Sequence, residues 1–225
     1  MNKHTLLKLS IRLVLAWLLL SVAGVTLGSQ ITSLLLPFFS VVVHSISPIY
    51  ENSLQIINYQ GSTMIEITAR LLHPVNVTDS LVIPPGKSLT ASIHVMHVLV
   101  PMIILYTFLF AWPVRKLQER LQLLLLGIPV NIIILGLTIP ALLAGHIEMQ
   151  LLSMIHAGGG QPVSPFLLKW VVFVEMGGLW LFPIIGAIAC GAMSRGINHL
   201  RNDFNRIGTS QSKNNRGRKK IRVKV

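Results

Sequence analysis

A short basic connector between two long apolar runs constrains this chain more than any other feature. The connector has the sequence VRKLQER at residues 114–120, and the apolar runs are residues 95–112 and 121–144. A membrane-spanning helix needs about 20 mostly apolar residues at 1.5 Å of rise each. Seven residues are too few to hold a domain between the runs. The sequence therefore predicts a helical hairpin that crosses a membrane.

Charge gives this hairpin an orientation. The connector carries Arg115, Lys116 and Arg120 against the single acidic residue Glu119. Short loops rich in lysine and arginine stay in the cytoplasm, so we expect the connector there. Three more basic residues precede the first apolar run, and ten lie between residues 195 and 224. This distribution predicts that both termini are also cytoplasmic.

Composition agrees with a membrane protein. Of the 225 residues, 52% are hydrophobic and 12% are charged, and the mean hydropathy is +0.67. Such values are untypical of a soluble domain. The fold class that we predict is an α-helical integral membrane protein with four transmembrane helices and a small extracytoplasmic β-rich segment.

The predicted organisation has six segments. They are an N-terminal membrane anchor at 1–28, an interfacial helix plus a periplasmic β-rich segment at 29–94, the transmembrane hairpin at 95–144, a periplasmic loop at 145–165, a last transmembrane helix at 166–194 and a basic cytoplasmic tail at 195–225.

The segment at 31–49 decides the number of spans. It is apolar but contains Pro37, with polar residues at helical intervals. If it crossed the membrane, the basic connector would lie outside, so we place it flat in the outer interface. The residues after it alternate in polarity. They predict a hairpin of strands 53–59 and 63–72 around Gln60 and Gly61, and a further short strand at 81–83.

Three residues in the predicted spans are candidates for contacts with another helix. Glu175 lies in the last apolar run, where a charged residue costs roughly 2.5–3.5 kcal/mol and must find a partner or a wet surface. Gly178, one turn later, offers a small surface for a close helix contact. Asn131 is predicted to hydrogen-bond between helices. We expect Glu175 to face either the run at 121–144 or a helix of a partner protein.

The remaining chemistry-bearing residues indicate no active centre. The sequence has no phosphate loop, nucleotide fingerprint, HExxH or GxSxG element, and we predict no cofactor. His94 and His97 have metal-ligand spacing, but no third ligand follows at a matching interval, so we predict no metal site. Cys190 lies in apolar surroundings and is predicted to pack. In the tail, Arg218, Lys219 and Lys220 are expected to contact anionic lipid headgroups rather than nucleic acid.

The segment order resembles that of exosortases, which are multispanning thiol transpeptidases or peptidases that process C-terminal sorting signals. In that family a cysteine starts one span, and an arginine follows a stretch with proline and asparagine in the next. The matching segment SLTASIHVMHVLVPMIILYTFLFAWP has no cysteine, and LQLLLLGIPVNIIILGLTIPALL has Pro129 and Asn131 but no arginine. The catalytic cysteine and arginine are therefore unmatched.

A second resemblance is to the exosortase H-associated membrane proteins, in the stretches VLVPMIILYTFLFAW and GLWLFPIIGAIA and in length and span order. This resemblance implies a non-catalytic accessory protein that binds a membrane enzyme or its exported substrate. Two other functions stay open. One is a divergent membrane peptidase that uses Ser88, Thr90 or Ser92 with His94 or His97. The other is a small transporter or channel subunit, with Glu175 as its titrating group.

Fusions to alkaline phosphatase test the predicted topology. We expect an active fusion after Pro85, because this enzyme folds only outside the cytoplasm, and inactive fusions after Lys116 and Val225. Enzyme activity is measured in whole cells and normalised to the amount of fusion protein. An inactive fusion after Pro85 would show that residues 31–49 cross the membrane.

Overall fold

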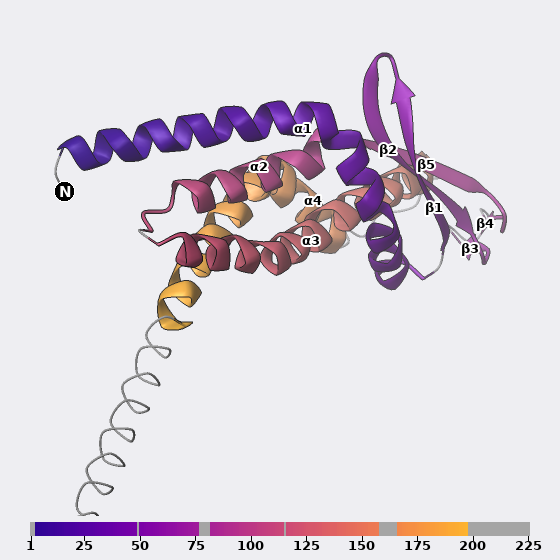
Figure 1. Cartoon of the computed structure of the whole chain (residues 1–225). Helices are drawn as coiled ribbons and strands as arrows, with labels where there is room; N and C mark the ends of the chain where they lie inside the picture. The colour runs from indigo at the N-terminus through magenta and orange to yellow at the C-terminus, as the bar shows by residue number, and fades with distance from the viewer. Residues whose placement is uncertain (1–2, 49, 77–81, 115, 158–165, 198–225) are drawn as a thin grey trace, which may run out of the picture.

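Long helices that run side by side make up most of the computed structural model, and a small sheet lies at one end of them (Figure 1). The structure describes residues 3–48, 50–76, 82–114, 116–157 and 166–197. The main helices are α1 (Lys3–Ile46), α2 (Met96–Ala111), α3 (Leu117–Ala157) and α4 (Phe166–Phe173). After α4, one wide π-helical turn, η1 (Val174–Gly178), leads into helix that continues to residue 197. We call the two ends the sheet end and the connector end.

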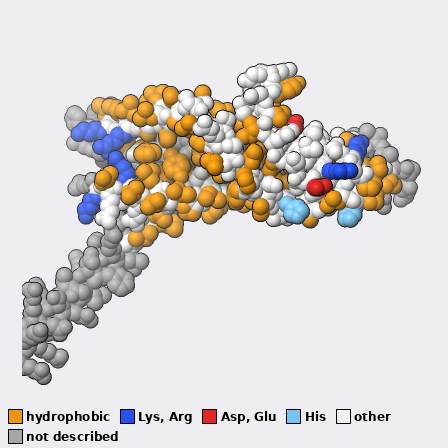
Figure 2. All heavy atoms as spheres, turned by 45° about the vertical axis from the view of Figure 1, so that its right-hand side comes forward, with side chains coloured by type: hydrophobic (Ala, Val, Ile, Leu, Met, Phe, Trp, Pro, Cys, Tyr) orange, Lys and Arg blue, Asp and Glu red, His pale blue; other side chains and the backbone are white. Residues whose placement is uncertain are grey.

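Within the described residues, three helical stretches are long and apolar enough to cross a membrane: Leu6–Ile46, Leu117–Met154 and Phe166–Ile197. The predicted class is confirmed at this level: the protein is mostly helical, with helices long and apolar enough to span a membrane and a small sheet. With 16 residues, α2 is shorter and spans about 24 Å. Figure 2 shows hydrophobic side chains over the middle of the molecule, a group of Lys and Arg side chains at one end, and acidic and histidine side chains together with a few more Lys and Arg toward the other.

The first helix differs from the prediction. A separate anchor at 1–28 and an interfacial helix after it were expected, but α1 is one helix of 44 residues. Its length is about 66 Å, twice the roughly 30 Å of a hydrocarbon core. Pro37 lies inside it, and proline removes a helical hydrogen bond and bends the axis. In Figure 1, α1 first runs along α2 and then turns across the bundle at the sheet end.

Packing explains why α1 does not end at Gly28. A Cβ atom at Gly28 would lie only 2.5 Å from the Leu99 side chain, and one at Gly24 would lie 3.0 Å from Ile103. Both glycines let α1 approach α2 closely. Gly28 is therefore a contact position and not a helix stop. Beyond the bend, Phe39 and Val43 are buried in the core beneath the sheet.

The third helix also differs from the prediction. Residues 145–165 were expected to form a loop, but α3 continues without interruption to Ala157. Gly145, which resembles a helix stop, packs against the side chain of Val171 in α4. After it, Ile147, Leu151 and Met154 recur at helical spacing and pack against the core under the sheet. The helix therefore continues past its apolar run because one face of its last turns packs on the core.

The main sheet has three antiparallel strands in the order β1-β2-β5. Their bounds are Tyr50–Tyr59 for β1, Ser62–Leu71 for β2 and Ser88–His94 for β5. The predicted hairpin is present. Its two-residue turn has positive φ at both Gln60 (49°) and Gly61 (79°), which matches the right-handed twist of the flanking strands.

The predicted short strand at 81–83 is present as β4, but it lies outside this sheet, whose third strand, β5, was not predicted. Val82–Ile83 (β4) pairs only with Val75–Asn76 (β3) in a separate ribbon, whereas β5 pairs with β2 over its whole length. In β5, the buried residues Leu89, Ala91 and Ile93 alternate with exposed ones, as a half-buried strand requires. This alternation is short and is followed almost directly by the apolar run of α2, so the sequence analysis did not recognise it as a strand.

One hydrophobic core joins the sheet to the helices. The buried face of the sheet includes Ile65 and Ile67 of β2. It packs on Phe39 of α1 and on Leu143 and Ile147 of α3. The sheet therefore rests on the two helices that extend past the bundle.

A glycine near the connector end generates a stability prediction. A Cβ atom at Gly191 would overlap the ring of Trp112, whereas a Cβ at Gly196, five residues later, would meet nothing within 4 Å. We expect Gly191→Ala to lower the free energy of unfolding by about 1–3 kcal/mol, the usual cost of overpacking. Gly196→Ala, the matched control, should leave it unchanged or slightly raised. Thermal unfolding in detergent measures both variants, and equal stabilities would contradict the Trp112 contact.

Candidate functional site at the sheet end

A groove of about 440 Å³ lies at the sheet end, between strand β5 and the last turns of α3. It is lined by Thr90, Ala91, Ser92, His146, Met149, Gln150 and Ser153. Two rigid elements therefore form its walls, a strand on one side and a helix on the other.

The local sequence explains why these side chains meet. His146, Met149, Gln150 and Ser153 are spaced i, i+3, i+4 and i+7, so they form one stripe along α3. The residues on the core side, such as Ile147, pack under the sheet. On β5, Thr90 and Ser92 occupy the exposed positions of the alternation. A hydrogen bond links the two walls, because the Gln150 side-chain amide donates to the backbone carbonyl of Thr90 at 2.6 Å.

His146 and Glu175 meet at one end of the groove. The His146 Nε2 atom lies 3.4 Å from Glu175 Oε1, and the side chains are 28% and 47% exposed. Glu175 belongs to the π-helical turn η1, in which Gly177 has φ 157° and ψ −11°. Few residues other than glycine adopt this backbone, so Gly177 permits the break that precedes the regular helix.

This pair locates Glu175 at the level where α3 leaves the bundle. Glu175 was expected to face residues 121–144 or a partner helix, and it meets α3 two residues beyond that range. The Glu175 carboxylate is half exposed and has an imidazole beside it, so it is not an unpaired charge buried among apolar side chains. Glu175 therefore fits a hydrated position at the membrane boundary as well as a contact with another protein.

The described atoms do not form a serine–histidine–acid relay. Ser92 and His146 line one groove, and His146 contacts an acid, as such a relay needs. The second ring nitrogen would then have to face the serine. In the described part of the chain, His146 Nδ1 is buried without a hydrogen-bond partner. The His97 ring is engaged elsewhere, since its Nδ1 lies 3.2 Å from the carbonyl oxygen of His94.

A small polar cluster lies near the start of β1 and includes Tyr50 and Asn52 of β1 and Glu148 of α3. Burial raises the pKa of the Tyr50 phenol, and the negative charge of Glu148 raises it further. Among the described residues, Glu148 Oε2 and Asn52 Nδ2 are buried without hydrogen-bond partners. Unpartnered buried polar atoms cost stability, so this cluster is a local weak point beneath the sheet.

The other predicted site residues lie away from the groove. Asn131 is 6% exposed within the helix bundle, and in the described residues its Oδ1 atom has no hydrogen-bond partner. A Cβ at Gly178 would meet Phe173 of its own helix at 3.3 Å, and the expected contact of Gly178 with a partner helix stays a prediction. Arg218, Lys219 and Lys220 lie outside the described residues.

Contacts between α3 and the last helix come from residues that the sequence analysis had not singled out. The Trp170 indole donates to the Leu137 carbonyl at 3.0 Å. A Cβ at Gly186 would lie 2.8 Å from Val130. Small residues at helical spacing are a signal for such contacts, but the sequence alone does not say which glycine faces which helix.

The predicted metal and thiol candidates have ordinary surroundings. No group of three or more His, Cys, Asp or Glu side chains with metal-binding geometry occurs in the ranges that the structure describes. Cys190 is fully buried and packs with Leu105, Leu109 and Ala187 in the core between the helices.

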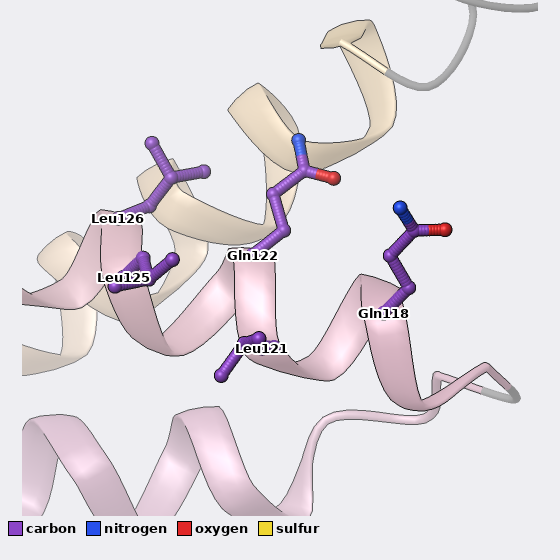
Figure 3. Close-up of a pocket in the computed structure, with 5 residues that line it drawn as sticks. All are labelled: Gln118, Leu121, Gln122, Leu125 and Leu126. Carbon is purple, nitrogen blue, oxygen red and sulfur yellow. The ribbon is translucent and has the colours of Figure 1, made fainter.

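The connector end has a second groove, of about 360 Å³. Figure 3 shows Gln118 and Gln122 projecting from one side of α3, with Leu121, Leu125 and Leu126 beside them. Nearby in the fold, the Arg195 guanidinium lies over the ring of Trp112, 5.9 Å from its centroid. Polar amides above leucines form an amphipathic surface at this end of α3.

No family model, curated protein or solved structure matches this chain.

Glu175 generates a prediction that separates a surface role from a packing role. Half-exposed ion pairs contribute less than about 1 kcal/mol, so Glu175→Leu should leave cellular abundance normal and shift the melting temperature by only a few degrees. Leu142→Ala, at a fully buried position packed near Val171 and Val174, should cost about 2–5 kcal/mol and lower abundance. Immunoblots and thermal unfolding provide the measurements. A similar loss in both variants would show that Glu175 is needed for packing.

Proposed function

We propose that this protein is a non-catalytic accessory protein of the bacterial inner membrane, acting in exosortase-type protein sorting or envelope export. In this proposal α1, α2, α3 and the last helix all cross the membrane. The two termini and the connector lie in the cytoplasm, and the sheet end lies outside. The protein acts by binding a membrane enzyme or its exported substrate at the sheet end.

Two features support this orientation. Basic residues gather at the connector end, as the charge rule requires of a cytoplasmic face (Figure 2). Two tryptophans also fit the boundaries of a bilayer. Trp112 packs at the level of Gly191, which is 21 residues from Trp170 along the last helix. At 1.5 Å per residue this path is at most about 32 Å, since the break at Gly177 shortens it, and it is close to the roughly 30 Å of a hydrocarbon core.

The groove between β5 and α3 is the observation that carries the proposal. Its stripe begins at His146, just past the apolar run, so the groove would face the extracytoplasmic space. The groove is open, five of its seven lining residues are polar, and its helical wall continues into the bundle. A membrane protein that presents such a groove on rigid elements is suited to holding a polypeptide near the membrane surface.

Crosslinking in living cells tests this proposal. A photoreactive phenylalanine derivative at Met149, a 45% exposed position in the groove, should form adducts with a discrete membrane enzyme or exported polypeptide. The same derivative at Leu125, exposed in the groove at the connector end, is the control and should not form that adduct. Mass spectrometry identifies the captured chain. If fully labelled Met149 gives no adduct other than lipid, the proposed function is wrong.

A further inference from the structure

We propose that the free edge of β5 binds an extended polypeptide segment, which adds a strand to the sheet in the groove beside α3. This inference rests on the proposed function and names the kind of ligand that the groove takes. The ligand class is a stretch of exported protein in β conformation, recognised mainly through its backbone.

The sheet topology leaves one side of β5 open. In the described part of the chain, β5 pairs with β2 only and is an edge strand. Backbone groups of alternate residues in an antiparallel pair point to opposite sides. The Thr90 carbonyl accepts from Gln150, which is outside the sheet, so the even-numbered residues of β5 direct their groups away from β2. The odd-numbered Val95, just after the strand, confirms this alternation because its N–H donates to Thr63 of β2.

Ser92 therefore directs both its N–H and its C=O into the groove, and Thr90 directs its N–H there. An incoming strand lies about 4.8 Å from its neighbour, which would bring it above the α3 stripe. That stripe supplies Met149 and Ser153 as a floor. A row of unpaired backbone groups above a helical floor is the arrangement in which extended peptides add to sheets.

The floor also indicates which side chains the segment carries. Met149 is flexible and 45% exposed, so it adapts to different apolar side chains. At the bundle end of the stripe, Glu175 lies beside His146 and favours a basic side chain there. The ligand is then a sequence-tolerant extended segment with small or β-branched residues and a basic residue at the end nearest the membrane.

Proline substitutions on the two edges of the sheet test the proposal. Ser92→Pro removes the N–H that points into the groove, and proline is tolerated where an edge N–H faces away from the ladder. Asn58→Pro is the matched control. The same alternation directs the Asn58 N–H away from β2, at the opposite edge of the same sheet. Ser153→Trp is a second test, because it fills the same groove from α3 and leaves the sequence of the strand unchanged.

The probe is a fluorescent peptide of alternating threonine and valine with a lysine at each end, added to the purified full chain in lipid nanodiscs. Its counterpart has N-methyl groups on alternate residues and cannot donate from one edge. We expect the probe to bind at least about tenfold more tightly than the N-methylated peptide, because the methyl groups remove the N–H that would donate to the Ser92 carbonyl and hold the peptide backbone away from the strand edge. Ser92→Pro and Ser153→Trp should weaken binding by a similar factor, and Asn58→Pro should not. Fluorescence anisotropy measures binding, and thermal unfolding checks that each variant is folded.

Equal affinity for the two peptides, or equal binding by folded Ser92→Pro and Asn58→Pro, would overturn the proposal. If Ser92→Pro does not fold, unchanged binding by Ser153→Trp would overturn it. Failure here is distinguishable from failure of the proposed function. A chain that binds no probe but crosslinks a membrane enzyme at Met149 keeps its accessory role and loses the strand-addition site. A chain that binds the probe but captures no polypeptide in cells keeps the site and loses the role.

Discussion

The packing of Leu143 and Ile147 beneath the three-stranded sheet is the contact on which the sheet end depends. Both side chains are almost completely buried, and both lie on α3 at or beyond the end of its apolar run. A sheet of three short strands is marginal in isolation and needs a hydrophobic face to rest on. The helix supplies that face by continuing past the bundle, so the position and tilt of the sheet follow from the rigidity of α3. The groove exists because the same turns of α3 that bury Ile147 on one side expose His146 and Met149 on the other.

Glycines determine how closely the helices approach within the bundle. Gly28 admits Leu99, Gly145 admits Val171, and Gly191 admits the ring of Trp112. Between helices in lipid, dispersion contacts replace the hydrophobic effect as the source of association, so close approach matters more than apolar character. The same residue type has a different use at Gly177, where backbone freedom permits the break after η1. Glycine is therefore ambiguous in this sequence, since it can signal a helix end, a contact or a break.

That ambiguity explains which parts of the fold could be predicted from the sequence. The apolar runs and the β1–β2 hairpin follow from local periodicity and from the Gln60–Gly61 turn, and these features are present in the structure. The predicted ends at Gly28 and Gly145 are wrong, because tertiary contacts and not local signals decide whether a helix continues through a glycine. The strand β5 was missed for a related reason, since its short alternation merges into the apolar run after it. The groove is formed by the two parts that were predicted wrongly, β5 and the turns of α3 beyond Gly145, so the sequence did not indicate that Ser92 and His146 lie together. The stripe from His146 to Ser153 does have a recognisable helical spacing.

The hydrogen bond from Gln150 to the Thr90 carbonyl partly protects the edge strand from aggregation and, in the described structure, leaves other backbone groups free to bind a ligand. Exposed edges invite aggregation, and proteins often cover them with a helix or loop. Here α3 packs under the strand, and its Gln150 side chain occupies one outward carbonyl of the edge, while the described structure shows no such hydrogen bond to the backbone groups of Ser92. The edge is also short, with only seven residues, and it runs almost directly into α2, which limits the length of any added strand. An edge with these properties would discourage indefinite stacking of sheets while accepting one short extended segment close to the bundle.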